Sequence, residues 1–259
     1  SIALASGDNI GKGVLEIDDE LIHIDSVDRS DRSAVISPFG RGYRGTTAAS
    51  HSADAKVTFA PSFPRLSVKR AINDTIRAIY PSVYGVASTT FSFSPSVTTY
   101  SIPAEAQTVL AVSYDTIGPS NEWLPIRRWR HDPTSNIGEY ATGNAISIYE
   151  AIVPGRTVNV VYAKTPTPLS NAGDVFTTVT GLEERSRDLI VYGAAYRMAS
   201  FLDPGRLNFT SPEADQNDQT RPFGSGTNTA RYLLALYQQR LQEESQKLNG
   251  KYPVRVHYT

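Results

Sequence analysis

The strongest constraint on the fold is a pair of long helical segments late in the chain. The first follows Thr180-Gly-Leu-Glu183, which matches the S/T-x-x-E capping box, and runs to about residue 202. The second spans 230–250, and its apolar positions are Leu234, Tyr237, Leu241 and Leu248. Helices of this kind depend on burying an apolar stripe, because propensity alone does not hold them in water. The two segments are therefore predicted to pack as the paired legs of a helical bundle.

A third helix is predicted at 63–80, where the apolar spacing changes to a helical period. Pro81 biases Tyr80 away from helical geometry and so ends this helix. Its only expected partner is the distant helical pair, since nothing nearby in sequence offers an apolar surface. Small side chains from Gly193 to Ala199 thin the first helix of the pair, so that another backbone can approach it closely.

The other segments alternate with the period of two that is typical of half-buried strands. An N-terminal β-meander is predicted from strands at 13–17, 20–26, 33–37 and 56–60. An antiparallel sandwich or barrel is predicted from six strands at 88–94, 98–103, 108–115, 122–131, 145–151 and 157–164. The predicted fold class is α+β, with a three-helix bundle (one helix before and two after) into which the β-domain is inserted. The expected domains are the meander (1–60), the bundle (61–82 and 180–250), the β-domain and linker (83–179) and an extended tail (251–259).

Composition excludes several classes of function. Lys and Arg number 25 against 26 Asp and Glu, so no global attraction to nucleic acid or to an anionic membrane is expected. The chain has no Cys, which excludes disulfides, thiolate zinc sites and Cys nucleophiles. No apolar run approaches the ~18–20 residues of a membrane span, and no signal-peptide pattern opens the sequence. We expect a protein made in a reducing cytoplasm.

Motifs that resemble catalytic or cofactor sites lack the context that such chemistry needs. The run Gly40–Gly45 matches G-x-G-x-x-G, but no helix is predicted after it and no acid follows at the expected spacing. We interpret it as a flexible basic loop in which Arg41, Tyr43 and Arg44 are candidate contacts for another protein or for passing DNA. The acidic run Asp18–Glu20 is interpreted as solvated charges in a hairpin turn. The four His residues are scattered, so we predict no catalytic, cofactor-binding or metal site and no enzyme activity.

Two aromatic and basic features leave alternatives open. Arg127–His131 mixes cations with Trp129 and would suit stacking on nucleic acid, although an exposed strand edge is the favoured interpretation. Four aromatic residues of the β-domain would suit a sugar-binding platform, but aromatic residues in strands more often form a core. They are Tyr114, Trp123, Trp129 and Tyr140.

The end of the chain has a strand-like pattern without an obvious partner. Val254, Val256 and Tyr258 alternate with Arg255 and His257. An extended segment of this kind can add a strand to the sheet of another protein. The candidate partner-binding residues are therefore Tyr252, Val254, Arg255, Val256 and Tyr258.

Three stretches carry a resemblance to a known family. Residues 13–57 resemble a module of tailed-bacteriophage structural proteins, in which E-I-D-D-E is followed by G-R-G-x-x-G-T-T-A-A-x-H. Residues 64–86 resemble the first helix of head-to-tail adaptor (connector) proteins, and 192–206 with 230–253 are similar to the rest of their helical bundle. The resemblance implies a virion protein of the neck. Related adaptors form a ring, usually of twelve subunits, between the portal and a tail terminator or tail-tube protein, and genomic DNA passes through it.

Two other functions are considered. A tail terminator or hub protein is a second candidate among virion proteins, although the long helical pair at 180–249 counts against it. A carbohydrate-binding protein or glycan hydrolase would use the aromatic residues of the β-domain, but no pair of carboxylates accompanies them. No membrane association and no cofactor are expected for any of these functions.

Overall fold

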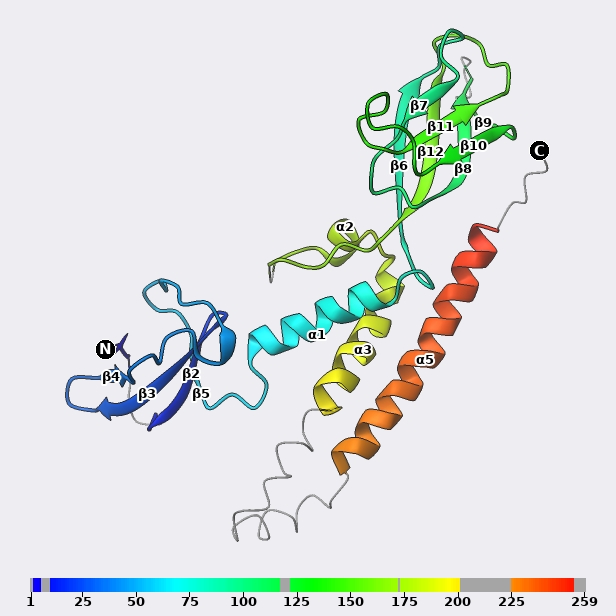
Figure 1. The fold of residues 1–259 in the computed structure, drawn as a ribbon. Helices are drawn as coiled ribbons and strands as arrows, with labels where there is room; N and C mark the ends of the chain where they lie inside the picture. The colour runs from blue at the N-terminus through cyan, green and yellow to red at the C-terminus, as the bar shows by residue number, and fades with distance from the viewer. Residues whose placement is uncertain (1, 6–9, 117–121, 172, 201–224, 254–259) are drawn as a thin grey trace. The chain divides into compact units, whose positions relative to one another are not determined.

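The computed structural model describes the chain except for residues 1, 6–9, 117–121, 172, 201–224 and 254–259 (Figure 1). It divides into two compact units. The first comprises Ser1–Ile72 with Ala194–Ala230, and the second comprises Asn73–Gly193 with Arg231–Thr259. The fold is α+β with antiparallel sheets, as the sequence predicts.

The first unit is built on a five-stranded antiparallel sheet in the order β1-β4-β3-β2-β5. Its strands are β1 (Ile2–Ala3), β2 (Gly13–Ile17), β3 (Glu20–Asp28), β4 (Ser33–Ile36) and β5 (Val57–Phe59). Strands β2, β3 and β4 pair in sequence order as a meander, at the places that the alternating pattern predicts. The sheet buries one apolar cluster, formed by Leu4, Leu15, Ile17, Ile22, Ile24 and Ala34. A single turn of 3₁₀ helix, η1 (Tyr43–Gly45), lies in the long connection between β4 and β5.

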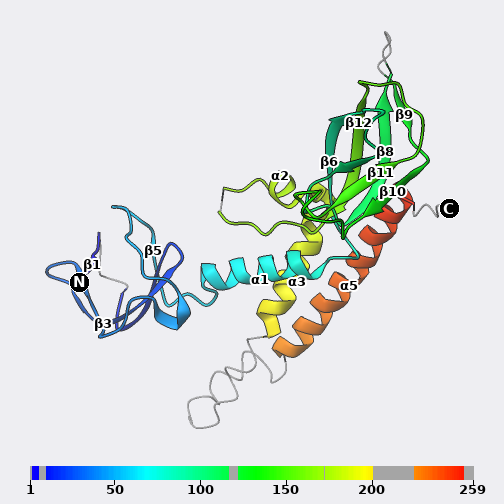
Figure 2. The ribbon, with the colours of Figure 1, turned by 45° about the horizontal axis from the view of Figure 1, so that its top comes forward.

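The β-domain of the second unit has two antiparallel sheets around one apolar core (Figure 2). The four-stranded sheet has the order β6-β12-β8-β9, with β6 (Gly85–Ser92), β12 (Thr157–Lys164), β8 (Thr108–Asp115) and β9 (Trp123–Pro125). The three-stranded sheet has the order β10-β11-β7, with β10 (Trp129–Asp132), β11 (Ala145–Ile148) and β7 (Thr99–Ser101). Residues from both sheets share the core, including Val112, Ile146, Val158 and Val160.

The prediction of one strand at 122–131 is wrong. This segment forms β9 and β10, which belong to different sheets, so the β-domain has one strand more than predicted. Strand β9 ends at Pro125, and the N–H of the next residue, Ile126, still donates to the Val112 carbonyl of β8 at 2.9 Å. The Ile126 side chain is buried in the core that the two sheets share.

Four helices are described: α1 (Arg65–Ala78), α2 (Phe176–Thr180), α3 (Arg187–Ser200) and α5 (Ser225–Lys251). A turn of 3₁₀ helix, η2 (Glu184–Ser186), precedes α3. The predicted linker 164–179 therefore contains most of the short helix α2, which the sequence pattern did not indicate.

The predicted capping box at Thr180 is also wrong. Thr180 is the last residue of α2, and its hydroxyl donates to the Phe176 carbonyl at 2.7 Å. The same hydroxyl accepts from the Leu182 N–H at 3.1 Å. Gly181 has a left-handed conformation, with φ of 72°, which ends α2 and separates Thr180 from the later helix.

Three helices of the second unit meet at Gly193. A Cβ atom at Gly193 (α3) would collide with Cγ2 of Thr75 (α1) and lie 2.9 Å from Cε2 of Tyr237 (α5). A larger residue would therefore force these helices apart. Gly193 thus has the close-packing role that the run of small residues predicts, and its neighbours belong to the same chain.

Candidate interaction sites

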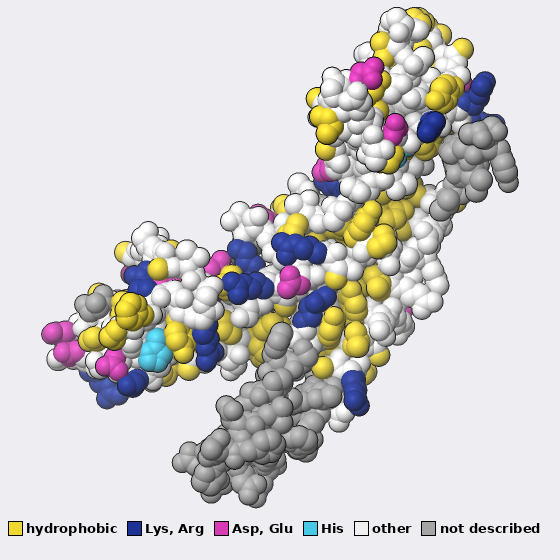
Figure 3. Space-filling view, in the orientation of Figure 1, with side chains coloured by type: hydrophobic (Ala, Val, Ile, Leu, Met, Phe, Trp, Pro, Cys, Tyr) yellow, Lys and Arg dark blue, Asp and Glu magenta, His cyan; other side chains and the backbone are white. Residues whose placement is uncertain are grey.

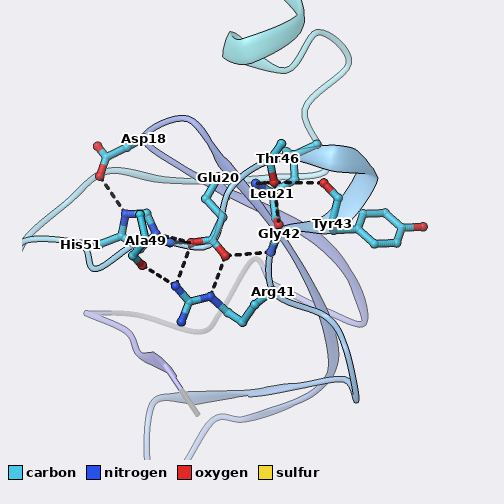
Figure 4. Close-up of polar contacts among 9 residues, drawn as sticks. All are labelled: Asp18, Glu20, Leu21, Arg41, Gly42, Tyr43, Thr46, Ala49 and His51. Atoms are coloured by element: carbon cyan, nitrogen blue, oxygen red, sulfur yellow. Dashed lines mark hydrogen bonds and ion pairs between the residues drawn. The ribbon is translucent and has the colours of Figure 1, made fainter.

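A buried carboxylate organises the connection after β4. Glu20 is the first residue of β3, and its side chain is 1% exposed. It accepts hydrogen bonds from Arg41 at 2.6 and 2.8 Å, from the Gly42 N–H at 2.9 Å and from the Ala49 N–H at 3.0 Å (Figure 4). One carboxylate thus holds both ends of residues 41–49.

A histidine completes this network. His51 Nε2 lies 2.9 Å from Glu20, and Nδ1 lies 2.9 Å from Asp18. Burial disfavours the charged imidazolium, but its hydrogen bonds to Asp18 and Glu20 outweigh burial and raise the pKa of His51 above its usual value. Burial also works against the Glu20 carboxylate, yet bonds from Arg41, Ala49, Gly42 and His51 together lower its pKa to about 2. The network therefore stabilises the charged forms of both Glu20 and His51.

We call residues 37–51 the Glu20 loop, and its backbone is held in a specific conformation. Gly42 has φ of 62°, where glycine is favoured because it has no Cβ. A Cβ atom at Gly40 would collide with the His23 carbonyl oxygen and lie 2.8 Å from that of Ser37. Phe39 and Arg44 are left-handed although they are not glycines, with φ of 57° and 54°. Such conformations cost energy that the surrounding contacts must offset.

The Glu20 loop presents aromatic and cationic side chains outward. Phe39 is fully exposed, at 101%. The Tyr43 ring packs against His23 with 5.3 Å between ring centroids, and the Arg44 guanidinium lies 5.5 Å from the centre of the Tyr43 ring. Phe39 is a candidate contact that the sequence reasoning missed; the signal available was an aromatic residue in the turn Ser37–Gly40.

The structure changes how two predictions about this loop are interpreted. Asp18 and Asp19 are exposed charges as expected, but that interpretation is wrong for Glu20. Arg41 binds Glu20 within the chain, so its role as a partner contact stays a prediction that must accommodate this bond. The partner contacts predicted for Tyr43 and Arg44 likewise stay predictions.

A second buried carboxylate lies on α5. The Glu244 side chain is 1% exposed and faces Arg185 Nε at 3.0 Å, Lys247 Nζ at 2.9 Å and Arg240 Nη2 at 3.6 Å. Arg185 belongs to η2, so this ion cluster joins α5 to the segment before α3. Glu244 is thus buried although it lies in a densely charged part of α5.

The end of α5 carries a further ion pair and opens onto a groove. Lys251 Nζ donates to Glu183 at 2.9 Å, which lowers the pKa of Glu183 and raises that of Lys251. The next residue, Tyr252, lines a groove of about 350 Å³. Other residues of its wall are Tyr80, Tyr84, Trp129, His131 and Asn249. Four of the candidate partner-binding residues lie outside the described part of the chain: Val254, Arg255, Val256 and Tyr258.

The four aromatic residues of the suggested sugar platform have different environments. Trp129 and Tyr114 are half-buried and pack against the core of the β-domain. Trp123 is exposed on the edge strand β9. The basic stretch begins with main-chain N–H groups of Arg127 and Arg128 that contact the Glu150 carboxylate, at 2.8 and 3.4 Å. At least two of the four suggested sugar-binding residues, Tyr114 and Trp129, therefore pack against the core of the β-domain.

Among the residues that the structure describes, no group of three or more His, Asp or Glu side chains is placed to hold a metal ion. None of the described helices is both long enough and apolar enough to span a membrane.

The fold and its sites define a mixed α+β protein in which charged side chains hold loops and helices in place. A family model described as "SU10 adaptor protein" matches residues 46–257. The chain therefore belongs to this family and is a bacteriophage structural adaptor protein, a component of the virion. The match covers all four described α-helices and the whole β-domain, while residues 1–45 precede it. A search of curated proteins finds no match.

Proposed function

We propose that this protein is a head-to-tail adaptor whose subunits form a ring between the portal and the tail, through which genomic DNA passes. The observation that carries the proposal is the family match over residues 46–257. We expect twelve subunits, as in the adaptors that the sequence resembles. The neighbour on the tail side would be a tail terminator or tail-tube protein.

A closed ring requires two different surfaces on each subunit that fit each other. Large apolar side chains are exposed on several elements of the second unit. Val191 and Tyr232 lie on α3 and α5, and Trp123 and Leu124 lie on β9. Figure 3 shows hydrophobic side chains exposed over the helices. Exposed apolar side chains of this kind can be buried in contacts between subunits.

The rigid part of the proposed subunit is the predicted three-helix bundle of α1, α3 and α5. The contacts of Gly193 with Thr75 and Tyr237 support this arrangement. The Glu244 cluster adds a second tie between α5 and η2. A rigid bundle would keep the contact surfaces of each subunit in a fixed geometry, which a ring of defined size requires.

Two parts of the chain are proposed to contact neighbours. The Glu20 loop would use Arg41, Tyr43, Arg44 and the exposed Phe39 against another virion protein. The C-terminal tail would dock on the portal or on an adjacent subunit through Tyr252, Val254, Arg255, Val256 and Tyr258. The near-zero net charge suits a channel for DNA, because strong phosphate contacts would slow its passage.

The first experiment is to measure the mass of the purified protein alone and after mixing with portal complexes. A stoichiometric ring that forms on the portal supports the proposal. Rings or tubes that form without the portal, and ignore it, would favour a tail terminator or hub. A monomer that binds neither would contradict both, and glycan binding would then be tested.

A deletion tests the role of the tail. Removing residues 251–259 should abolish assembly and leave a folded monomer, because the deletion begins at the end of α5. The matched control removes only Thr259 and should assemble normally. Complete rings from the longer deletion would overturn the role given to the tail.

A further inference from the structure

Strand β6 forms one edge of the four-stranded sheet, and half of its main-chain groups point away from that sheet. Its register with β12 runs from Gly85 opposite Lys164 to Ser92 opposite Thr157. The Phe93 N–H donates to the Arg156 carbonyl at 2.8 Å, so the odd-numbered residues form the hydrogen-bonded pairs with β12. The even-numbered residues therefore face outward, and the Val86 N–H accordingly donates to Gly181 at 3.3 Å.

Beyond Val86, this outer edge is open. Ser88, Thr90 and Ser92 make no hydrogen bond there through N–H or carbonyl groups within the described residues. Natural edge strands are usually protected by charged side chains, Pro, bulges or short length. β6 has eight residues and none of these devices. By contrast, β9 at the other edge has three residues and ends in Pro125.

The two faces of β6 specify what kind of strand fits beside it. On the core side, the Phe91 ring stacks on Tyr100 with 4.2 Å between ring centroids, and both rings are only half-buried. On the other face, Ser88, Thr90 and Ser92 are exposed and uncharged. An added strand would therefore carry apolar side chains on one face and polar ones on the other.

The end of this chain has that pattern. Val254, Val256 and Tyr258 alternate with Arg255, His257 and Thr259. Six extended residues span roughly 20 Å, enough to pair with the open part of β6. We propose that the β6 edge binds residues 254–259 of a second copy of this chain by strand addition. The inference rests on the proposed ring, in which each subunit would pass its tail to a neighbour.

A second copy is favoured over the subunit's own tail by the position of Pro253. Pro253 lines the same groove as Thr108 and Leu110 of β8 and Trp129 of β10. In the four-stranded sheet, β8 and β6 lie on either side of β12, so about 10 Å separates them. Crossing that distance would use about three of the six remaining residues, which leaves too few to pair along β6.

The first test measures binding of a labelled peptide of residues 251–259 to the full-length chain by fluorescence anisotropy. Thr90→Pro removes an outward N–H and leaves the bonds to β12 intact, so the variant should fold and bind the peptide at least about tenfold more weakly. Thr90→Val keeps the N–H and should bind as the wild type does. Undetectable binding, or equal binding by both variants, would overturn the proposal. Thermal unfolding of each variant checks that it is folded.

The second test uses the absence of Cys from the native chain. Thr90→Cys is combined with His257→Cys, on the polar face of the added strand, in the full chain, which is then oxidised with portal complexes present. We expect disulfide-linked multimers on a non-reducing gel, whereas Trp123→Cys with His257→Cys should remain uncrosslinked. An intrachain disulfide, or links from the tail to the portal alone, would overturn the proposal.

The two tests separate this inference from the proposed function. Peptide binding that Thr90→Pro weakens, in a protein that never forms rings, would support strand addition at β6 and count against the ring. A ring that forms normally with Thr90→Pro would support the adaptor function and overturn strand addition at β6.

Discussion

Glu20 and Glu244 are both almost fully buried carboxylates, but their partners differ. Glu20 is bound by two main-chain N–H groups, Arg41 and His51, all from one loop. Glu244 is bound by the long side chains of Arg185, Arg240 and Lys247. Main-chain donors cannot move without changing the path of the backbone, whereas long cationic side chains can. Glu20 therefore determines a loop conformation, and Glu244 holds together two elements that are already formed.

Burial of a charged side chain therefore does not by itself reveal its structural role. Arg185 and Lys247 are 38% and 44% exposed, so both can turn to water if Glu244 changes. The N–H groups of Gly42 and Ala49 have no such freedom while the loop keeps its path. We therefore expect perturbations at Glu20 to have the larger effects.

The largest effect is expected from Glu20→Gln, which removes the charge but keeps the shape. The main-chain N–H groups of Gly42 and Ala49 lose the charged acceptor that they share, and a hydrogen bond to a charged group contributes about 1.5–3 kcal/mol, so we expect a loss of at least about 3 kcal/mol of unfolding free energy. Chemical denaturation measures the loss, and hydrogen exchange should show faster exchange at Gly42 and Ala49. The control Asp25→Asn changes an exposed carboxylate paired with Lys12 and should leave stability unchanged. Slow exchange in the Glu20 variant would show that the loop does not depend on this carboxylate.

A smaller loss is expected from Glu244→Gln, about 2 kcal/mol by the same denaturation measurement. Its cationic partners can be solvated after the change, so less energy is lost than at Glu20. Helical circular dichroism at low denaturant should match the wild type. A loss as large as that of the Glu20 variant would contradict the contrast between the two sites.

The next largest effect is expected from Gly193→Ala, which tests whether close packing at this position holds α1, α3 and α5 together. The added Cβ would collide with Thr75 and press on the Tyr237 ring, for a loss of about 1–2 kcal/mol. Gly250→Ala is the matched control on α5, because no atom lies within 4 Å of a Cβ there. This control should be neutral or stabilising by up to about 1 kcal/mol. Equal stability of the two variants would mean that the helices do not meet at Gly193.

The smallest effect is expected from pH. The pKa of His51 is raised in the folded state, so its contribution is fully present below pH 6.5. The contribution is lost as the pH rises through the raised folded-state value. Unfolding free energies of the wild type and of His51→Gln, measured from pH 5.5 to 8.5, should therefore converge as the pH rises. A gap that stays constant would show that His51 carries no charge in this network.

Much of the fold could be predicted from periodicity alone. The strands at 108–115 and 157–164 match the prediction residue for residue, because alternation along a strand reports its own two faces. Helix α1 lies within the predicted 63–80 for the corresponding reason. The assignment to a phage adaptor protein agrees with the family match, although most of residues 13–57, which carried part of the resemblance, lie before the matched range.

The candidate sites could not be predicted from local sequence patterns, because they are formed by residues that lie far apart along the chain. Glu20 and Asp19 are neighbours of the same type, yet one is buried and the other is exposed. Their difference arises from donors that lie 21 to 31 positions away along the chain. The full exposure of Phe39 could not be predicted from its place in a turn, because exposure depends on what packs against a residue.

Local sequence patterns were enough to assign which segments have a strand period and which a helical one, because the amphipathicity of each element follows from its own consecutive residues. They did not determine that the segment 122–131 divides between two sheets, or that Thr180 ends one helix instead of starting another. These points were settled by contacts made in the folded chain. Each depends on hydrogen-bond donors, acceptors and apolar surfaces from distant parts of the chain, and a carboxylate becomes a buried anchor only where the fold places such donors around it.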